Sequence, residues 1–197
     1  MVEDKSSKKG KYIIVVGPSG VGKNTLINQY LKEHPQNELG ISTTSRQIRE
    51  GEVEGVNYYY ISKREFEKKI EERDLIEYAK YSGNYYGTPK SALLGFLDRG
   101  INVLNEIECQ GMLQIKKLLS RDQYLVIFIV PPSLEILEKR IIERAQISKE
   151  ELTKRMETAK IELSYINEAD IKINSIEGDF KGTYDDFKNK LNKKLGK

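Results

Sequence analysis

Seven residues near the start of the chain have the types and the spacing of a phosphate-binding loop. The loop reads Gly17-Pro18-Ser19-Gly20-Val21-Gly22-Lys23, and it lies between the apolar run Tyr12-Ile13-Ile14-Val15-Val16 and a helical pattern. Glycines at this spacing let successive backbone N–H groups converge on phosphate oxygens, and the N-terminal end of the next helix adds partial positive charge. Lys23 can reach the distal phosphates. The segment therefore predicts binding of a nucleoside triphosphate; the alternative is a plain glycine-rich turn.

The residue after the lysine departs from the usual pattern of such loops. A Ser or Thr hydroxyl normally meets Mg²⁺ at this position, whereas here it is Asn24 and the hydroxyl follows at Thr25. We expect both residues to belong to the triphosphate site. Asn24 is a candidate metal ligand through its amide oxygen; otherwise Mg²⁺ is held mainly by phosphates and water.

A second apolar run ends in an acid that suits a metal site. Glu106 follows Ile101–Asn105, an arrangement that resembles a Walker-B strand, in which the acidic group holds hydrated Mg²⁺ beside a phosphate loop. Glu106 is therefore a candidate metal residue, which would contact Mg²⁺ directly or through a water molecule. The alternative is a solvated acid at the end of a buried strand.

Two arginines three residues apart, Arg46 and Arg49, have the chemistry to form a fork for a second phosphate group. Tyr58 and Tyr86 are candidates to add hydroxyl donors. The alternatives are surface charge for the arginines and strand packing for the tyrosines, in a chain with 12 tyrosines and 33 Lys and Arg residues. These four residues need independent support before they count as a site.

The hydrophobic pattern predicts the scaffold that would position these residues. Short apolar or β-branched runs, with helical patterns between them, lie at Tyr12–Val16, Ile101–Asn105, Tyr124–Val130 and Ile171–Ile173. This alternation is typical of a parallel sheet covered by helices. The sequence therefore predicts an α/β fold in which the phosphate loop follows the first strand.

The segment between the first two runs predicts an inserted α+β subdomain. It holds the run Tyr58-Tyr59-Tyr60-Ile61, a helix opened by the capping box Ser62-x-x-Glu65, and a strand Leu75–Tyr81 that ends at Ser82-Gly83-Asn84. We expect residues 41–91 to form this subdomain within a core of residues 11–40 and 92–197. The polar, lysine-rich residues 1–10 predict a disordered tail.

An arginine-bearing pair of helices is predicted within residues 133–165. Pro132-Ser133 starts a helix that reaches Arg144, and Ser148-x-x-Glu151 caps the second helix. Arg140 and Arg144 lie four residues apart, so they share one face of the first helix. The pair is a candidate lid.

The charge balance and the numbers of cysteine and histidine residues exclude or disfavour several other classes of function. The 33 basic and 30 acidic residues give a net charge of +3, which is too balanced to call for nucleic acid or an anionic membrane as a partner. Cys109 and His34 are the only residues of their types, so an intrachain disulfide and a Cys/His metal cluster are both excluded. The longest apolar stretch, Leu125–Val130, is far too short to span a bilayer. We expect a cytoplasmic protein.

Taken together, these residues resemble those of the guanylate kinases over nearly the whole chain after the tail. Besides the phosphate loop, the match includes Ser42-Thr43-Thr44-x-Arg46-x-x-Arg49-x-Gly51-Glu52, Tyr58, Glu77, Ser82-Gly83-Asn84-Tyr85-Tyr86-Gly87-Thr88, Gln110-Gly111 and Pro131-Pro132-Ser133. The resemblance implies a P-loop nucleoside-monophosphate-kinase fold with a core, a GMP-binding subdomain and a helical lid. It also implies transfer of the γ-phosphoryl group of ATP to GMP, and to dGMP, with Mg²⁺, by a monomer or a dimer.

The resemblance also assigns roles to individual residues. It implies that Arg46, Arg49, Tyr58 and Tyr86 grip the GMP phosphate, that Ser42, Glu77, Thr88 and Glu108 surround guanine, and that Lys23, Arg46, Arg140, Arg144 and Arg155 act on the transferred group. Asn174 is implied to lie near adenine. Guanine presents adjacent N1–H and N2–H donors that one carboxylate can accept, whereas adenine offers an acceptor nitrogen there, so Glu77 is the leading specificity candidate.

The chain departs from the family on the side that would face the metal. Glu106 and Glu108 stand where aspartates are common, so both carboxylates reach one methylene farther. A non-catalytic guanylate-kinase-like module that binds phosphopeptides is the alternative function. The retained phosphate loop favours catalysis, because such modules usually have a degraded ATP site.

Overall fold

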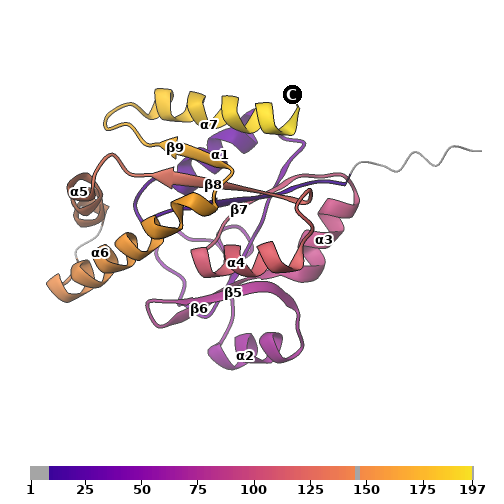
Figure 1. Cartoon of the computed structure of the whole chain (residues 1–197). Helices are drawn as coiled ribbons and strands as arrows, with labels where there is room; N and C mark the ends of the chain where they lie inside the picture. Colours follow the sequence, from indigo (N-terminus) through magenta and orange to yellow (C-terminus); the bar gives the residue numbers. More distant parts are fainter. Residues whose placement is uncertain (1–8, 145–146, 197) are drawn as a thin grey trace, which may run out of the picture. The chain divides into compact units, whose positions relative to one another are not determined.

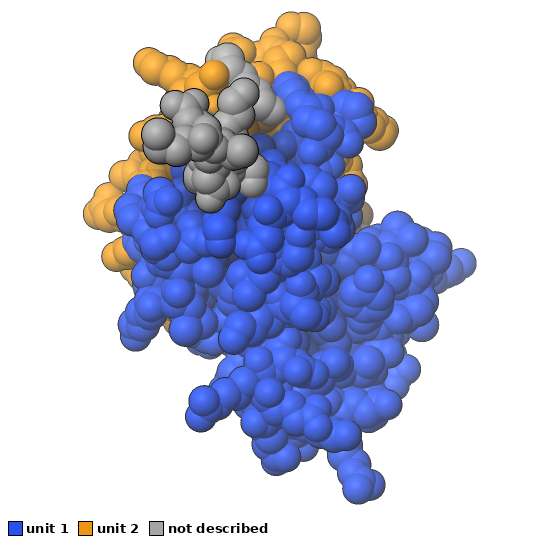
Figure 2. All heavy atoms as spheres, turned by 90° about the vertical axis from the view of Figure 1, so that its right-hand side faces the viewer, with its two compact units in different colours: residues 1–14, 34–124 blue, residues 15–33, 125–197 orange. Residues whose placement is uncertain are grey.

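The structure, a computed structural model, describes residues 9–144 and 147–196 and divides into two compact units. Unit 1 comprises the chain up to Ile14 together with His34–Tyr124, and unit 2 comprises Val15–Glu33 and the chain from Leu125 onwards (Figure 2). The first strand, β1 (Tyr12–Val16), therefore contributes residues to both units.

Unit 1 contains parallel strands beside the first residues of β1. Strand β2 (Glu38–Leu39) pairs in parallel with β7 (Val103–Glu106), and Glu38 lies opposite Val103. The order β2, β7, β1 puts β7 in the middle, where the N–H of Val103 donates to the carbonyl of Lys11 at 3.0 Å. Helices α3 (Lys90–Asp98) and α4 (Cys109–Leu118) belong to the same unit. Only two residues, 107 and 108, separate the end of β7 from the start of α4.

A second sheet of unit 1 has the strand order β4-β3-β6-β5. Its strands are β3 (Thr43–Thr44), β4 (Tyr59–Tyr60), β5 (Leu75–Tyr81) and β6 (Asn84–Pro89). The last two form an antiparallel hairpin in which Glu77 lies opposite Thr88. Ser82 and Gly83 at its turn have φ values of 46° and 82°, the left-handed conformations that a tight two-residue turn requires. The hairpin thereby fixes which side chains share a face of the sheet.

Helices cover this second sheet within unit 1. Helix α2 (Lys63–Glu71) contacts β6, and α4 contacts β5 (Figure 1). The predicted capping box is confirmed, since the hydroxyl of Ser62 accepts from the N–H of Glu65 and the Glu65 carboxylate accepts from the N–H of Ser62. Phe66, fully buried in α2, stacks on Tyr85 of β6 at 5.2 Å between ring centroids. Helix α2 thus anchors the strand that carries Tyr86 and Thr88.

Unit 2 contains the phosphate loop, its helix and a parallel pair of strands. Strand β8 (Tyr124–Val130) pairs in parallel with β9 (Ile171–Asn174), and α1 (Lys23–Glu33) follows the loop. The C-terminal helix α7 (Phe180–Leu195) contacts α1 and β9, with Tyr30 and Phe187 edge to face at 5.9 Å. The remaining helices are α5 (Leu134–Arg144), α6 (Lys149–Leu163) and the 3-10 helix η1 (Ser164–Glu168).

Several sequence-based boundaries can be compared with these elements. Strands Tyr12–Val16 and Tyr124–Val130 are confirmed, whereas the strand predicted at 101–105 spans Val103–Glu106. Of residues 1–10, predicted to be a disordered tail, Gly10 is buried and its N–H donates to the carbonyl of Leu97 at 2.8 Å; residues 1–8 lie outside the described part. The predicted lid, 133–165, includes α5 and α6, and its residues 145 and 146 also lie outside the described part. The proposed subdomain limits, 41–91, stay a prediction.

Among the described residues, none of the helices is both long enough and apolar enough to cross a membrane.

Candidate functional site

The phosphate loop of unit 2 depends on glycine at its first position. Gly17 has φ of +137°, and a Cβ there would lie 2.4 Å from the carbonyl oxygen of Ile129 in β8. Only glycine combines this backbone conformation with so close an approach to the neighbouring strand. The loop then leads into α1, whose first turn contains no acidic residue to offset the positive end of the helix. The backbone arrangement suits an anion.

Lys23, the first residue of α1, lies at the loop and not in solvent. Its side chain is 7% exposed. The ammonium donates to the carbonyl oxygens of Gly17 at 2.5 Å and Pro18 at 3.1 Å. Those two bonds hold the cation against the loop backbone, where it adds a full charge to the partial charges of the loop.

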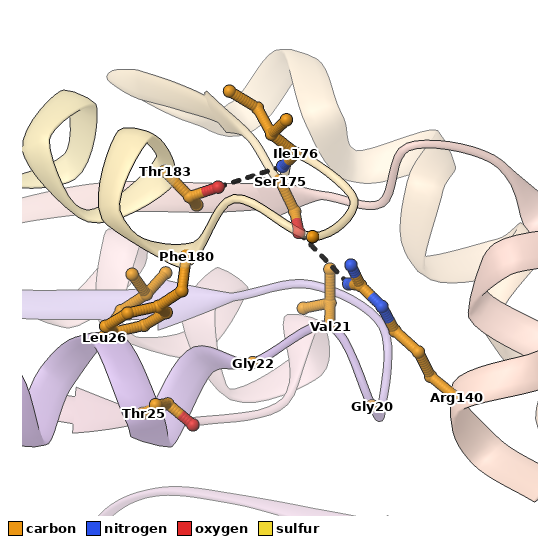
Figure 3. Close-up of a pocket in the computed structure, with 11 residues that line it drawn as sticks. Gly20, Val21, Gly22, Thr25, Leu26, Arg140, Ser175, Ile176, Phe180 and Thr183 are labelled. Carbon is orange, nitrogen blue, oxygen red and sulfur yellow. Dashed lines mark hydrogen bonds between the residues drawn. The ribbon is translucent and has the colours of Figure 1, made fainter. Parts of the chain in front are cut away.

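A pocket of about 350 Å³ opens beside the loop in unit 2 (Figure 3). Its lining combines the loop and α1 with α5, the turn after β9, and α7. The residues are Gly20, Val21, Gly22, Thr25, Leu26, Arg140, Ser175, Ile176, Gly178, Phe180 and Thr183. Its size is within the range of small-molecule sites in proteins. Five residues predicted for the triphosphate site or its lid therefore share one pocket: Gly20, Val21, Gly22, Thr25 and Arg140.

The turn after β9 supplies pocket residues that the sequence did not reveal. Asn174, the predicted adenine neighbour, is the exposed last residue of β9, and the next residue, Ser175, lines the pocket and is buried. Ile176 and Phe180 also line it and stay half exposed, at 49% and 47%. Two exposed apolar side chains at a pocket lined by both apolar and polar residues suit the flat face of a base. Asn174 itself does not line this pocket, and its place near adenine stays a prediction.

The three predicted arginines of α5 and α6 differ in their surroundings. Arg140 points from α5 towards the turn after β9 and donates to the hydroxyl of Ser175 at 3.1 Å (Figure 3). Arg155 forms an ion pair with Glu151, one turn earlier in α6, at 2.5 Å. Its Nε is buried and has no hydrogen-bond partner within the described part of the chain. The side chain of Arg144 lies outside the described residues.

In unit 1, Arg46 is the centre of a cluster with the predicted tyrosines. Its guanidinium lies over the rings of Tyr58 and Tyr60, at 5.6 and 5.7 Å from their centroids. The rings of Tyr58 and Tyr86 meet edge to face at 5.9 Å. Because Thr44 pairs with Tyr86 between β3 and β6, Arg46, two residues later, follows the same edge. Three of the four predicted phosphate residues are therefore together.

Glu52 is the fixed counter-ion of this cluster. Its two carboxylate oxygens accept from the guanidinium of Arg46 at 2.8 and 3.0 Å, and one also accepts from the hydroxyl of Tyr60 at 2.8 Å. Burial alone would raise the pKa of Glu52, but the bonds from Arg46 and from the N–H of Arg49 outweigh it and lower the pKa to about 2. Glu52 therefore stays ionised and orients Arg46.

Arg49 is not part of this contact set. Its backbone N–H donates to Glu52 at 2.8 Å, while its side chain is exposed. Of the two arginines in the predicted fork, Arg46 has its guanidinium held by Glu52, and Arg49 has its guanidinium exposed to solvent. A spacing of three residues places two side chains on one face only in a helix, and residues 46–49 are not helical.

The residues predicted around guanine meet in the interior of unit 1. Ser42, Glu77 and Thr88 are buried, and the Thr88 hydroxyl donates to the Glu77 carboxylate at 2.6 Å. The Nδ2 of Asn105 lies 3.1 Å from the hydroxyl oxygens of both Ser42 and Thr88. Asn105 was not predicted as a site residue, because its role comes from contacts between segments far apart in the sequence.

The Glu77 carboxyl is an ionisable group in an enclosed position. Its side chain is 3% exposed. Burial raises its pKa to about 7; hydrogen bonds from Thr88 oppose that shift, and the charge of Glu108 adds to it. Its Oε2 lies against the start of α4, where a Cβ on Gly111 would be 2.1 Å away. A glycine at 111 therefore makes room for the carboxylate.

The two acids predicted near the metal stand at the end of β7. Glu106 is the last residue of β7 and Glu108 caps α4, and both are half buried. Burial and the charge of Glu106 raise the pKa of the Tyr58 hydroxyl, with smaller contributions from Tyr86 and Glu108. Within the described ranges, no three His, Cys, Asp or Glu side chains come together as a metal cluster. Asn24 is exposed in unit 2.

Each of these side chains, taken by itself, suits a cation that takes most of its ligands from elsewhere. Mg²⁺ is commonly bound through one or two carboxylates together with substrate phosphates and water. The half-buried Glu106 carboxylate offers such an oxygen ligand in unit 1, and the exposed Asn24 amide offers one in unit 2.

Comparison with known proteins points to one family. A family model described as guanylate kinase matches residues 9–194. The guanylate kinase of Clostridium tetani is 45% identical over 160 residues, which cover 81% of this chain and 76% of that protein. That of Malacoplasma penetrans is 39% identical over 193 residues, covering 98% of this chain and 97% of that protein. The crystal structure of guanylate kinase from Anaplasma phagocytophilum superposes with a TM-score of 0.79 at 28% identity, covering 97% of this chain and 89% of that one.

Proposed function

The chain belongs to the guanylate kinase family, and from that premise we propose that it transfers the γ-phosphoryl group of ATP to GMP, giving ADP and GDP. The resemblance and the P-loop kinase fold predicted from the sequence are both confirmed. A phosphotransferase of this family uses ATP as its donor. Extension of the activity to dGMP is part of the proposal.

The acceptor nucleotide is assigned to unit 1. Arg46, Tyr58 and Tyr86 would bind the GMP phosphate, because a guanidinium and two phenolic hydroxyls are its natural donors. Arg49 is retained in this role as a solvent-exposed donor, since the guanidinium paired with Glu52 is that of Arg46. Because Glu52 already orients the Arg46 guanidinium, Arg46 would bind the phosphate without first changing its conformation.

Recognition of guanine is assigned to Ser42, Glu77, Thr88 and Glu108. The observation that carries the proposal is the buried Glu77 carboxylate, held on one oxygen by Thr88 and enclosed on the other by Gly111. A carboxylate in a fixed orientation can accept the adjacent N1–H and N2–H of guanine. Adenine would leave the same buried carboxylate facing an acceptor nitrogen, which is strongly unfavourable.

The donor nucleotide is assigned to unit 2. Gly17, Pro18, Ser19, Gly20, Val21 and Gly22 would hold the phosphates through backbone N–H groups, with Lys23 adding charge. Asn24 and Thr25 complete the start of α1. The base would lie at the pocket beside Ile176 and Phe180, near the predicted Asn174. Arg140, Arg144 and Arg155 are proposed to stabilise the charge on the transferred group.

Mg²⁺ is the proposed metal cofactor, with Asn24 and Glu106 as the residues that would hold it, Glu106 directly or through water. When bound with ATP, the ion neutralises negative charge on the phosphates. The residues of this chain then contribute orientation and positive charge: phosphoryl transfer needs aligned reactants and little covalent chemistry from the protein.

Nothing in the comparisons favours the non-catalytic alternative. A module that only bound phosphopeptides would have no use for a buried lysine aligned on an intact phosphate loop.

A coupled assay of ADP release with ATP, Mg²⁺ and each of GMP, dGMP, AMP, UMP and CMP tests the proposal. We expect turnover with GMP and very little with AMP. Lys23→Met should lose turnover and retain GMP binding, because Lys23 and the acceptor residues belong to different nucleotide sites. Folded wild-type protein that releases no ADP in the presence of GMP would refute the proposed function.

A further inference from the structure

One buried carboxamide connects three hydroxyl groups beside the Glu77 carboxyl. Asn105, in β7, is 4% exposed, and its Nδ2 lies 3.2 Å from the hydroxyl of Tyr12 and 3.1 Å from those of Ser42 and Thr88. The hydroxyls of Tyr12 and Thr88 are 3.3 Å apart. All four residues belong to unit 1. The network surrounds the proposed guanine site, although Asn105 itself is not one of the proposed guanine contacts.

With Glu77 ionised, the form that can accept from guanine, proton counting fixes the direction of the bonds. The Thr88 hydroxyl has one proton, and it is donated to the Glu77 carboxylate at 2.6 Å. The contact between Thr88 and Asn105 must therefore be a bond that Thr88 accepts. An amide nitrogen carries two protons and no acceptor, which agrees with Nδ2 facing the hydroxyl oxygens. The chain of bonds runs from Asn105 through Thr88 to Glu77.

The same argument applies to Ser42. Its hydroxyl oxygen accepts from Asn105, so its own proton points away from Asn105 and can be donated to a bound molecule. Without a buried donor at position 105, the hydroxyls of Ser42 and Thr88 could rotate. Asn105 thus removes rotational freedom from two residues that are proposed to contact the base.

The backbone around Asn105 holds the carboxamide in place. A Cβ on Gly40 would lie 2.9 Å from the Cβ of Asn105 and 3.0 Å from its Nδ2. The N–H of Gly40 also donates to the carbonyl of Leu104 at 2.7 Å. Gly40 therefore lies directly against the side chain, and Asn105 has little space in which to turn.

We propose that Asn105 is a positioning residue for the acceptor base: its carboxamide sets the direction of the Ser42 and Thr88 hydroxyls and thereby holds the Glu77 carboxylate in the orientation that accepts guanine. This inference rests on the proposed function and adds to it a residue that does not touch the nucleotide. The role depends on N–H donation and not on the volume of the side chain.

Two substitutions at this position separate donation from volume. Asn105→Asp keeps the shape and removes both donors, so the surrounding hydroxyls would turn to donate to position 105 and Thr88 would leave Glu77. Asn105→Leu keeps a similar volume without offering a competing acceptor. If Asn105 acts by donation, Asp should harm GMP recognition more than Leu. If it only fills space, Leu should leave KM for GMP unchanged, and the buried acid that Asp introduces should lower stability without a selective rise in KM for GMP.

Asn102→Asp is the matched control. Asn102 precedes the same strand, donates to the side chain of Asn37 at 3.0 Å and accepts from the N–H of Lys11 at 2.9 Å, outside the network of Glu77. The substitution makes the same chemical change in the same part of unit 1. It should lower stability while leaving KM for GMP within about twofold of wild type, since no contact with the base is affected.

Steady-state kinetics with GMP, AMP and ATP provide the test. We expect Asn105→Asp to raise KM for GMP by ~10-fold or more, as the loss of hydrogen bonds to a charged group implies. The preference for GMP over AMP, as kcat/KM, should fall by a similar factor. KM for ATP should stay within about twofold, because the donor residues lie in the other unit. Asn105→Leu should raise KM for GMP by about threefold.

Unchanged KM for GMP in Asn105→Asp, with the wild type active, would overturn the inference and leave the proposed function standing. Equal loss of GMP and ATP affinity would also overturn it, because that pattern indicates general damage. If Asn105→Asp does not fold, the Asn105→Leu variant decides: a selective rise in KM for GMP supports the inference and an unchanged KM refutes it. A wild type without GMP-dependent turnover would overturn both.

Discussion

Replacing Glu77 with glutamine should stabilise the protein at alkaline pH while it weakens GMP recognition. The Glu77 carboxyl is 3% exposed. Burial raises its pKa from 4.5 to about 7, the charge of Glu108 adds to the rise, and the hydrogen bonds from Thr88 only partly offset it. Glutamine has nearly the same shape as the protonated acid and carries no charge to bury. The variant therefore removes the cost of an ionised Glu77 from the folded state.

The sign of the effect follows from proton binding. The pKa of Glu77 is higher in the folded protein than in the unfolded chain, so between pH 4.5 and 7 the folded state binds more protons. Stability is greatest at or below the unfolded pKa and falls as pH rises through this window. A rise from 4.5 to about 7 corresponds to ~3 kcal/mol when both states are ionised. The stability gained by Glu77→Gln should grow by ~2 to 3 kcal/mol between pH 5 and pH 8.

Urea unfolding of both proteins, followed by circular dichroism at pH 5, 6, 7 and 8, measures this difference. Carboxyl groups that do not interact with Glu77 titrate equally in both proteins, so the difference isolates Glu77 together with its coupling to Glu108. Glu67→Gln is the control, because Glu67 is exposed in α2 and pairs only loosely with Lys63. Its stability difference from wild type should stay below about 1 kcal/mol, as for an exposed ion pair. A constant difference between Glu77→Gln and wild type across pH 5 to 8 would refute the reasoning.

Two further predictions concern the geometry of unit 1. Gly111→Ala should raise KM for GMP by ~10-fold, because its Cβ would lie 2.1 Å from Oε2 of Glu77 and displace the carboxylate; Gly95→Ala, in α3 with open space around it, should leave KM unchanged in the same assay. Glu52→Gln should lower the free energy of unfolding at pH 7 by ~2 kcal/mol, since it breaks the charged pair with Arg46. Because the pKa of Glu52 is lowered to about 2, that difference should shrink as pH falls from 4.5 towards 2, and acid unfolding curves that stay parallel would contradict it.

Features set by local sequence were predictable. The capping box at Ser62 and Glu65 involves residues three apart, and the strand Leu75–Tyr81 ends before Ser82-Gly83 as predicted. The phosphate loop is likewise one continuous segment, and the spacing of its glycines and lysine is enough to indicate phosphate binding. For Glu77, the guanine assignment came from the family resemblance, and the buried position agrees with it.

Features set by contacts between distant segments were not predictable from patterns. Asn105 lies 63 residues from Ser42 and 17 from Thr88 along the chain, so nothing in the local sequence connects it to either hydroxyl. Gly111 was noted only as part of a family motif, and its physical reason, the space taken by Glu77, appears only in three dimensions. Arg46 and Arg49 are close in sequence, yet their side chains differ in exposure, and the role of Arg49 at the phosphate stays a prediction.

The single cysteine gives the acceptor site an internal reporter of its own opening. Cys109 is the first residue of α4, 4% exposed, and lies two residues before the Gly111 that encloses Glu77. A thiol reagent can reach a buried sulfur only after local unfolding, so its rate of labelling measures the free energy of opening that turn. The chain has one cysteine, so every labelled molecule is labelled at Cys109. Mass spectrometry of the unsubstituted protein would therefore measure local opening of the first turn of α4, next to the proposed guanine site.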